Sequence, residues 1–567
     1  MQSSRSQLME KSSSASATFW LSAFAASLSC FCAGYQLGIV SGSMLYIKHE
    51  LDIERVSVQE ALVSGHTVTG TLCSLADGWL ADRLGRRRTL ALGALATLAA
   101  ALLCSTAASP AALIAGRLLA GVGIGVGMPL SPLYVAEAAP ASLRGRAVTA
   151  NTLFIPIGIA AASLASALAT YLPEAAWRYT MAFVALPAAL QLLAFYFMHD
   201  SPRWLMESGR VEAAGLAMRA FRTTHLAADA ELADIQTACI ARKRQRAQFG
   251  ESMLRHVLGV ASVRRAFLVG GLVQGAQQVT LISVLLGYTG SILEASGLGG
   301  RSEVLWLSLL VFSLFLLAQS ASIFVVERAG RRPACFISHG LTAAALLLIG
   351  IGFSLVTADS PRLQASSCGQ LLAADASCAD CIALPQCGFC YQQIDEGVLG
   401  SCLMREQAGG NCSAGVGLSW AQDYCPSSSS WLVLLGLLLF ICVFGPGMGA
   451  MPNTLNAEIY PQWARGTGNA LASGVAWSIG FLTTSTFLSF SQALTKAGAF
   501  YFYSGVNFVV CVLLYLLVPE TKGRSLEEVD ALFEHWIQVP WLRKEPEPSR
   551  LLEVPTEPFS INSIAPY

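Results

Sequence analysis

Charged residues are scarce in this chain, at 13% of its 567 residues, against ~25% in ordinary soluble domains. Basic and acidic residues balance at 36 each, so no excess of positive charge indicates nucleic acid as a partner. Hydrophobic residues reach 54%, more than the interior of a soluble protein of this size can hold. The composition therefore excludes a disordered chain and an ordinary water-soluble globule, and it favours a polytopic membrane protein.

Long apolar runs fill most of the chain. A membrane-spanning helix needs ~20 mostly apolar residues, and barrel strands would instead alternate over ~10 residues. The runs are too long and continuous for barrel strands, so the sequence predicts twelve spanning helices. These spans are expected to begin near Phe19, Val58, Leu90, Ala111, Ala147, Trp177, Ala266, Val304, Cys335, Trp431, Thr467 and Phe500.

Lys and Arg gather in alternate loops, above all after spans two, four and eight and in the segment after span six. Because cytoplasmic loops carry the excess of basic residues, both termini are predicted to be cytoplasmic. The expected organisation is a disordered N-terminus (1–18), a six-helix half (19–198), a helical cytoplasmic linker (199–265), a second six-helix half (266–518) interrupted by an extracellular Cys-rich loop (358–429), and a cytoplasmic tail (519–567).

The two halves share short motifs. Basic motifs containing Gly85 and Gly330 follow spans two and eight, and a Glu precedes an Arg by seven residues after spans four and ten. Two six-helix repeats around a midplane site are the layout of a secondary transporter. The matched residues are Asp82-Arg83…Gly85-Arg86-Arg87, Glu327-Arg328…Gly330-Arg331-Arg332, Glu137…Arg144 and Glu458…Arg465.

Further motifs carry a resemblance to a known family; they are Arg117…Gly121…Gly125, Pro132 to Gly145, Asp200-Ser-Pro-Arg-Trp-Leu205, Gln277-Gln278 and Pro519-Glu-Thr-Lys-Gly523. Over roughly 19–535 the chain resembles the sugar porter family of the major facilitator superfamily. The stretch 445–470 and the Cys-rich loop look most like the animal proton/myo-inositol cotransporters. The resemblance implies an all-α membrane protein with twelve transmembrane helices in two six-helix repeats, no enzymatic activity and no cofactor or metal.

The resemblance also assigns charged residues to a cytoplasmic gate. An ionisable residue inside a span costs at least ~2.5 kcal/mol on insertion scales, so Arg117 is expected to have partners in this network; snorkelling to the inner interface is the alternative. The family implies salt bridges between the repeats that hold the cytoplasmic side shut, and static anchoring is the alternative. The residues implied are Asp82, Arg83, Arg117, Glu137, Arg144, Glu327, Arg328, Glu458 and Arg465.

A central solute site is implied by the same resemblance. A polyol or hexose needs neutral donors and acceptors together with aromatic faces, and the amides of Gln277 and Gln278 can both donate and accept. Trp477 matches an aromatic residue that packs on the sugar ring. The alternatives are hydrogen bonding between helices for the two glutamines and plain packing for Trp477. Thr152, Ser283 and Asn453 stand at family site positions where many hexose transporters have Gln, Asn and Trp, so the lining differs and the solute stays open.

Position 36 bears on proton coupling. Gln36 stands where proton-coupled members have Asp, and an amide cannot take up and release a proton. His66 in span two is the remaining candidate, because histidine titrates near neutral pH; a neutral packed histidine is the alternative. The residues therefore favour facilitated diffusion, whereas the resemblance favours symport.

Eight of the sixteen cysteines cluster in the loop before span ten, and an even number in an oxidising compartment predicts four disulfides with 105 conceivable pairings. The cluster resembles a plexin–semaphorin–integrin module. Zinc is the alternative, although zinc ribbons usually separate their Cys pairs by ~15–20 residues. Asn411 begins a glycosylation sequon. The cysteines are Cys368, Cys378, Cys381, Cys387, Cys390, Cys402, Cys412 and Cys425.

The favoured function is a secondary transporter that moves a small polyol or sugar, with myo-inositol preferred, by alternating access. A facilitative hexose uniporter is the first alternative, and a non-transporting surface sensor that uses the Cys-rich loop is the second. The expected partners are the solute, the lipid bilayer and, for a symporter, protons. Glu547, Leu551 and Leu552 resemble an acidic dileucine signal for an endocytic adaptor, so the expected location is the plasma membrane with cycling through vesicles.

Overall fold

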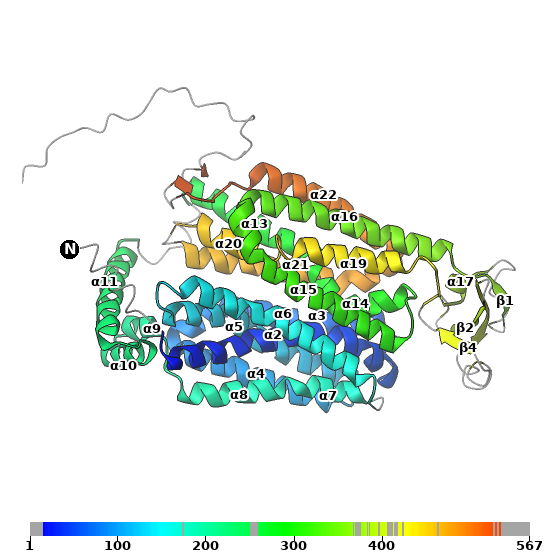
Figure 1. The fold of residues 1–567 in the computed structure, drawn as a ribbon, viewed down its shortest axis with the longest axis horizontal. Helices are drawn as coiled ribbons and strands as arrows, with labels where there is room; N and C mark the ends of the chain where they lie inside the picture. The colour runs from blue at the N-terminus through cyan, green and yellow to red at the C-terminus, as the bar shows by residue number, and fades with distance from the viewer. Residues whose placement is uncertain are drawn as a thin grey trace, which may run out of the picture.

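The computed structural model is a long bundle of helices with a small sheet module at one end and a layer of further helices across the other (Figure 1). We call these the module end and the linker end. The residues that the structure describes are 15–172, 175–249, 259–366, 368, 376–382, 384, 386–394, 397–404, 412, 418–421, 424–461, 464–524, 528–529 and 532–533.

The first half begins with a helix that is longer than expected. α2 covers 34 residues, because its last turns continue along the second half of the bundle to Glu50. Ser109 caps α5 by accepting a hydrogen bond from the backbone N–H of Ala112 at 3.3 Å, with Pro110 at the first helical position. The helices are α2 (Ala17–Glu50), α3 (Val56–Leu84), α4 (Arg86–Ser105), α5 (Pro110–Ala138), α6 (Arg144–Ala169), α7 (Ala176–Phe183) and α8 (Ala185–Phe197).

The second half contains two broken spans. α13 (Ala261–Val279) and α14 (Ile282–Ala295) meet at Leu281, whose φ of 69° is in the left-handed region that a leucine rarely adopts. A glycine-rich stretch separates α19 (Trp431–Phe444) from α20 (Met451–Ile459). The remaining helices are α15 (Arg301–Ala329), α16 (Arg331–Ala358), α21 (Arg465–Leu494) and α22 (Lys496–Leu517).

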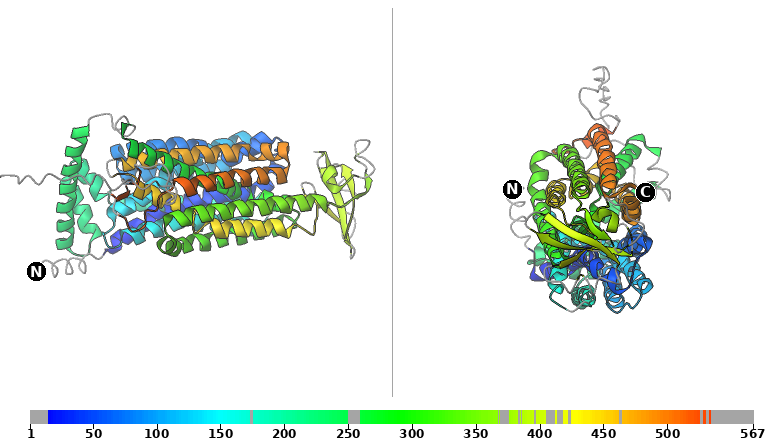
Figure 2. Two further views of the ribbon diagram at one scale, coloured as in Figure 1. Left: turned by 90° about the horizontal axis from the view of Figure 1, so that it is seen from above. Right: turned by 90° about the vertical axis from the view of Figure 1, so that its right-hand side faces the viewer.

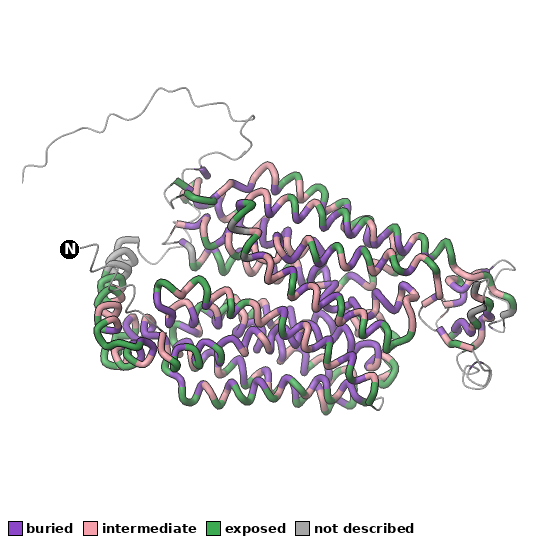
Figure 3. Tube along the Cα trace, viewed as in Figure 1, coloured by how far each residue is buried: buried purple, intermediate pink, exposed green. Residues whose placement is uncertain are grey.

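All twelve predicted spans are helical. Within the described ranges, ten helical segments are long and apolar enough to cross a membrane. The other two expected spans correspond to α3, which carries more polar residues, and to the broken pair α19–α20. Exposed residues run along the outside of the bundle (Figure 3), and on α8 they include Leu186, Leu190 and Leu193, an apolar face suited to lipid.

The linker is helical where it is described. α9 (Pro202–Glu207), α10 (Val211–Phe221) and α11 (His225–Phe249) lie across the linker end of the first half (Figures 1 and 2). Ser16 at the start of α2 donates its hydroxyl to the carbonyl oxygen of Ala220 at 2.5 Å, which ties this layer to the first span.

The module at the other end projects beyond the helices (Figure 2). Its sheet has the order β1-β3-β2-β4, with β2 (Cys387–Ile394) antiparallel to β3 (Gly397–Met404) and to β4 (Leu418–Ala421), and with β1 (Leu363–Ser366) parallel to β3. Asp380 caps the short helix α17 (Cys378–Ile382) by accepting from the backbone N–H and the hydroxyl of Ser377, and these bonds lower the pKa of its carboxyl.

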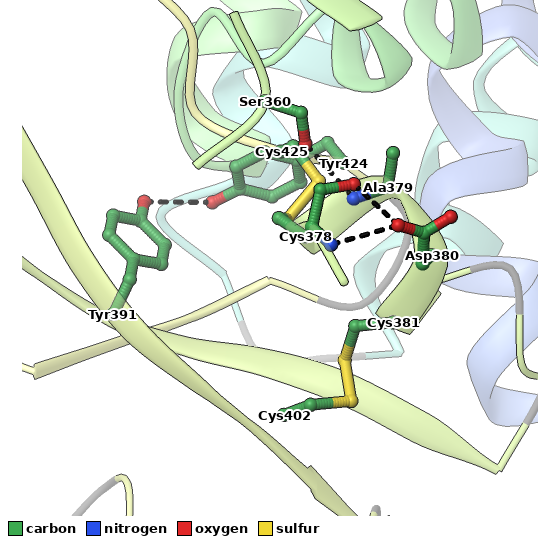
Figure 4. Close-up of a disulfide and its surroundings, with 10 residues drawn as sticks. Ser360, Cys378, Ala379, Asp380, Cys381, Tyr391, Cys402, Tyr424 and Cys425 are labelled. Carbon is green, nitrogen blue, oxygen red and sulfur yellow. Dashed lines mark hydrogen bonds between the residues drawn. A yellow bond between two sulfur atoms is a disulfide. The ribbon is translucent and has the colours of Figure 1, made fainter. Parts of the chain in front are cut away.

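Four disulfides staple this module, as the even cysteine count predicted. They join Cys368 to Cys387, Cys378 to Cys425, Cys381 to Cys402 and Cys390 to Cys412 (two of them in Figure 4). The zinc interpretation is therefore wrong, because zinc needs free thiolates and all eight sulfurs are bonded to one another. Cys378–Cys425 closes the base of the module, where α17 meets the chain that leads into α19.

Several predictions fall outside the described residues. These are the sequon at Asn411, the dileucine pattern at Glu547, Leu551 and Leu552, and the first 14 residues. The side chains of Glu327 and Arg465 lie outside the description as well.

Candidate transport site

The two glutamines predicted to read solute hydroxyls lie at the break between α13 and α14. The Gln277 Nε2 donates to the carbonyl oxygen of Met448 at 2.8 Å, which belongs to the break between α19 and α20. Gln278 Oε1 accepts from the hydroxyl of Ser283 at 2.5 Å. The structure therefore brings three predicted residues and two helix breaks to one level of the bundle.

A third glutamine of α13 extends this polar group. Gln274 Nε2 donates to Asn453 Oδ1 at 2.9 Å, so the predicted Asn453 is oriented by a residue that sequence reasoning missed. The spacing of three and four residues from Gln277 and Gln278 could have indicated Gln274, since such residues share a helix face. All of these groups are neutral donors and acceptors, as a polyhydroxylated solute requires.

The two remaining predicted residues lie in different surroundings. The ring of Trp477 on α21 faces α3, where a Cβ at Gly70 would lie 3.5 Å from Trp477 Cζ3. One turn further along α21, a Cβ at Gly480 would lie 3.1 Å from Gln278 Oε1, so α21 connects the glutamines to the first half. Thr152 on α6 is exposed, and its hydroxyl donates to the carbonyl oxygen of Thr149 at 2.9 Å. None of its described hydrogen bonds reaches the glutamines at the helix breaks.

A buried cation lies in the first half, near the module end of α5. Arg117 is only 1% exposed, and it donates to the backbone and side-chain oxygens of Gln36 at 3.0 and 3.2 Å. Its Nη2 lies 2.8 Å from His66 Nδ1, and its Nε donates to the carbonyl oxygen of Leu62. Because an arginine only donates, His66 Nδ1 is the acceptor and its proton sits on Nε2. We call Gln36, His66 and Arg117 the Arg117 cluster.

This position corrects both expectations for Arg117. Its contacts are Gln36, His66 and Leu62 rather than the charged residues of the linker end, so it does not join the expected cytoplasmic network. Its burial also excludes snorkelling to the inner interface. The described polar partners of Arg117 are all neutral, so no ion pair offsets the desolvation cost of burying its charge. Four hydrogen bonds from the guanidinium lower that cost.

Matching ion pairs lie at the linker end of each half. Arg86 binds Glu137 through Nε and Nη2 at 3.1 and 3.2 Å, and its Nη1 donates to Asp82 at 3.0 Å. In the second half Arg331 binds Glu458 at 2.9 Å, and the hydroxyl of Thr521 donates to the same carboxylate at 2.5 Å. We call the group of Asp82, Arg86 and Glu137 the linker-end cluster.

Two carboxylates that sequence reasoning did not single out complete the repeat. Asp200 accepts from the backbone N–H of Arg86 at 3.0 Å, and Glu520 accepts from that of Arg331 at 3.0 Å. Each carboxylate thus caps a helix that follows a left-handed glycine, Gly85 or Gly330, and Gly is the residue that adopts this conformation at low cost. Both carboxylates lie inside motifs quoted above, which was the available signal.

The expected salt bridges between the repeats are not made in this conformation by the pairs described. Arg86 and Arg331 pair within their own halves, Arg144 Nε donates to the carbonyl oxygen of Ala136, and Arg83 stacks on Trp79 at 4.2 Å. The backbone oxygen of Arg328 accepts from Lys522. Pairing between the halves stays a prediction for a state in which the two linker ends meet.

At the module end, polar contacts join the two halves. The carboxylate of Glu60 on α3, which is 5% exposed, accepts from the backbone N–H and hydroxyl of Ser489 on α21 at 2.7 and 2.8 Å. Lys48 binds Glu294 at 3.0 Å. The backbone N–H of Gly290 donates to the hydroxyl of Ser41 at 2.9 Å. We call the Glu60–Ser489 pair the module-end latch.

Comparison with known proteins identifies the family of this chain. The family model described as "Sugar (and other) transporter" matches residues 21–374 and 403–533. The chain belongs to this family. It is therefore a multi-pass membrane transporter and not an enzyme, as the motifs predicted.

Curated relatives match most of this chain, and their names concern inositol or sugar. The human proton myo-inositol cotransporter is 36% identical over 527 residues, which cover 89% of this chain and 80% of that protein. Inositol transporter 4 of Arabidopsis thaliana is 30% identical, over 90% of this chain and 91% of its own. The galactose-proton symporter of Escherichia coli (strain K12) is 27% identical over 89% of this chain and 92% of its own.

Solved structures confirm the predicted fold. The partially occluded inward open conformation of the xylose transporter XylE from E. coli superposes with a TM-score of 0.64 at 18% identity, and it covers 90% of this chain and 100% of that one. The major facilitator architecture of two six-helix halves is thereby shown, and the Cys-rich module is an addition to it.

Proposed function

We propose that this protein moves a small polyhydroxylated solute, with myo-inositol preferred, across the plasma membrane together with protons. The observation that carries the proposal is the polar group at the two helix breaks, where Gln277, Gln278 and Ser283 meet beside α21. Neutral amides and hydroxyls can exchange their internal hydrogen bonds for those of a polyol without burying a charge. The names of the human and Arabidopsis relatives support inositol as the preferred solute.

Alternating access follows from the way the halves are joined. The latch, the Lys48–Glu294 pair and the Ser41–Gly290 bond hold the module ends together, so the solute route opens toward the linker end in this state. Opening toward the module end requires these bonds to break, while the ion pairs inside each half can persist. α14 carries two of the three contacts, and its left-handed hinge at Leu281 is where such a movement would be absorbed.

The module end is proposed to face the outside of the cell. Its four disulfides persist in an oxidising compartment, and the basic ends of α4 and α16 lie at the opposite end, as cytoplasmic ends do. Both termini are then cytoplasmic.

A facilitative uniporter is the second candidate, and the Arg117 cluster favours it. Gln36 is an amide at the position where proton-coupled relatives are expected to have a carboxyl. Arg117 donates a hydrogen bond to His66 Nδ1 and so occupies the ring nitrogen that a second proton would need. If no other group carries the proton, transport runs down the solute gradient alone.

Uptake of labelled myo-inositol, with glucose as comparator, tests these functions in cells that express the protein at the surface. Inositol uptake that rises as the outside becomes acidic is expected for the symporter. Uptake of either solute that is independent of pH would replace the symporter with a uniporter. Absence of both fluxes, with surface expression verified, would contradict transport of this solute class.

A further inference from the structure

Two carboxyls of α3 are buried without a described cation partner, and they differ in their hydrogen bonds. Glu60 is satisfied by Ser489, whereas Asp77, at 6% exposure, has an Oδ1 that lacks any hydrogen-bond partner among the described residues. The carboxylates of Glu137, Glu294 and Glu458 are each held by an Arg or Lys. Among the buried acids described, Asp77 is thus the one that has no ion pair of its own and one oxygen, Oδ1, without a donor.

Asp77 lies on the same face of α3 as His66. The two are eleven residues apart, about three helical turns, which places Asp77 toward the linker end by roughly 16 Å. Between these two residues, Gly70 and Cys73 lie close against Gly125 of α5. A Cβ added at Gly125 would overlap with atoms of both Gly70 and Cys73. This face is therefore pressed against α5, and Asp77 points into the first half rather than toward lipid.

The charged groups around Asp77 come from three helices. On α3 itself this is Asp82, with the neutral, titratable thiol of Cys73 one turn before Asp77. α4 contributes Arg86, and α5 contributes Glu137, the partner of Arg86. α21 also packs on α3, and its charged residue is Arg465 at its first position. Arg86 is close enough to act on Asp77 electrostatically, but its described hydrogen bonds go to Glu137, Asp82 and the carbonyl oxygen of Ala81.

We propose that Asp77 is the proton-binding carboxyl of the transport cycle, in place of the acid that is missing at position 36. In the conformation described here the acid holds the proton on a carboxyl oxygen, because ionising a buried carboxyl whose Oδ1 has no described donor carries a desolvation cost that no ion pair offsets. Loss of that proton to water on the linker side leaves a carboxylate beside Arg86. No bond other than the O–H bond is made or broken.

Proton loss at Asp77 is coupled to the linker-end cluster through Arg86. An ionised Asp77 competes with Glu137 and Asp82 for the guanidinium, so the cluster that fixes the start of α4 rearranges when the proton leaves. His66 is a poorer carrier, since a second proton on its ring would have to displace Arg117 from Nδ1 and would place two cations side by side.

This inference rests on the proposed symport, and purified protein in liposomes separates the two. Proton entry during myo-inositol influx is followed with a pH dye, and inositol exchange at equal pH is measured in parallel. The parent protein is expected to show both. If the parent exchanges inositol without proton entry, the symport itself fails, whatever the variants do.

Asp77→Asn should keep exchange and lose both proton entry and accumulation driven by a pH gradient, because the amide imitates the protonated acid. Asp77→Glu should restore proton entry. Glu303→Gln, at the exposed start of α15 where glutamine can still cap the helix, should behave as the parent. Proton entry that persists in Asp77→Asn would overturn the proposal, and so would loss of exchange in a folded Asp77→Asn protein.

Discussion

The two ends of the helix bundle hold their charges in different ways. At the linker end, each half contains its own ion pair, Arg86 with Glu137 and Arg331 with Glu458, and each pair has the same backbone cap. At the module end, Glu60 and Lys48 reach across to the other half. The duplicated contacts stabilise each half as a body, while the contacts that have no duplicate decide how the bodies sit relative to each other.

This difference indicates which contacts change during transport. A contact that is repeated in both halves lies inside each six-helix unit and can survive a rocking movement of one unit against the other. A contact that joins the two halves at one end has to break when that movement separates them there. The latch and the Lys48–Glu294 pair are therefore expected to set the equilibrium between states, whereas the linker-end cluster is expected to set the stability of the first half.

The largest effect is expected at the base of the module. Replacing Cys378 and Cys425 by Ser removes a cross-link between residues 47 apart, a loop whose closure is worth about 4 kcal/mol in the chain-entropy estimate. The module should become sensitive to protease while the helix bundle stays resistant. Fragment analysis after limited proteolysis, under non-reducing conditions, checks this. If the module of the variant resists protease as well as that of the parent, the rest of the module holds its fold without the Cys378–Cys425 disulfide.

Breaking the module-end latch should shift the equilibrium between states. Glu60→Ala removes a buried charged acceptor of two hydrogen bonds, each worth ~1.5–3 kcal/mol when one partner is charged. The module end should then open more often. The measurement is the rate at which an impermeant maleimide labels Ser41→Cys from the module side, in a chain whose eight free cysteines have been replaced.

Glu303→Gln is the matched control for the latch. It changes a carboxyl at the same end of the bundle, and the described hydrogen bond of that carboxyl goes to the backbone at the start of α15 rather than to the other half. Labelling of Ser41→Cys that is equally slow in the Glu60→Ala and Glu303→Gln backgrounds would mean that the latch does not hold the halves together.

The corresponding arginines of the two halves should differ in their contribution to stability. The side chains of Arg86 and Glu137 are 7% and 11% exposed, against 19% and 29% for Arg331 and Glu458. Removing one partner of a buried pair costs ~3–5 kcal/mol, and partly exposed pairs contribute less. Arg86→Ala should therefore lower the thermal unfolding temperature more than Arg331→Ala. The reverse order would contradict the assignment of the first-half cluster as the more buried one.

The smallest effect is expected for Lys48→Ala. Its single described contact with Glu294 joins side chains that are 16% and 10% exposed, whereas Glu60 accepts two hydrogen bonds, and the remaining exposure lets salt weaken the pair. Maleimide labelling of Ser41→Cys should rise slightly at low salt and match the parent at high salt. If Lys48→Ala raised the labelling rate as much as Glu60→Ala does, the Lys48–Glu294 pair would be the main contact that holds the module ends together.

Patterns local in sequence predicted much of this structure. Apolar runs gave twelve helices, matched motifs gave two halves, and the cysteine count gave four disulfides, because each signal lies within a short stretch. The pairing of the cysteines and the module-end latch could not be predicted in this way. Glu60 and Ser489 are 429 residues apart, and neither belongs to a repeated motif or a periodic pattern.

The candidate site was predicted less completely than the fold. Gln277, Gln278, Ser283 and Asn453 meet at the helix breaks, but the break between α13 and α14 depends on Leu281 in a conformation that no propensity favours. Arg117 was expected at the cytoplasmic side, because a motif identifies a residue but not the depth at which its partners lie. Asp77 belongs to none of the motifs that the sequence analysis identified. It is distinguished only by its buried Oδ1, which has no described hydrogen-bond partner.

The most direct test of the account is a pair of distance measurements across both ends of the bundle. Spin labels at Glu54→Cys and Ser302→Cys report on the module end, and labels at Arg88→Cys and Arg328→Cys report on the linker end. With myo-inositol present, the account predicts a population in which the module-end distance is longer and the linker-end distance is shorter than in the structure described here. A module-end distance that stays unchanged while the labelled protein still transports inositol would contradict it.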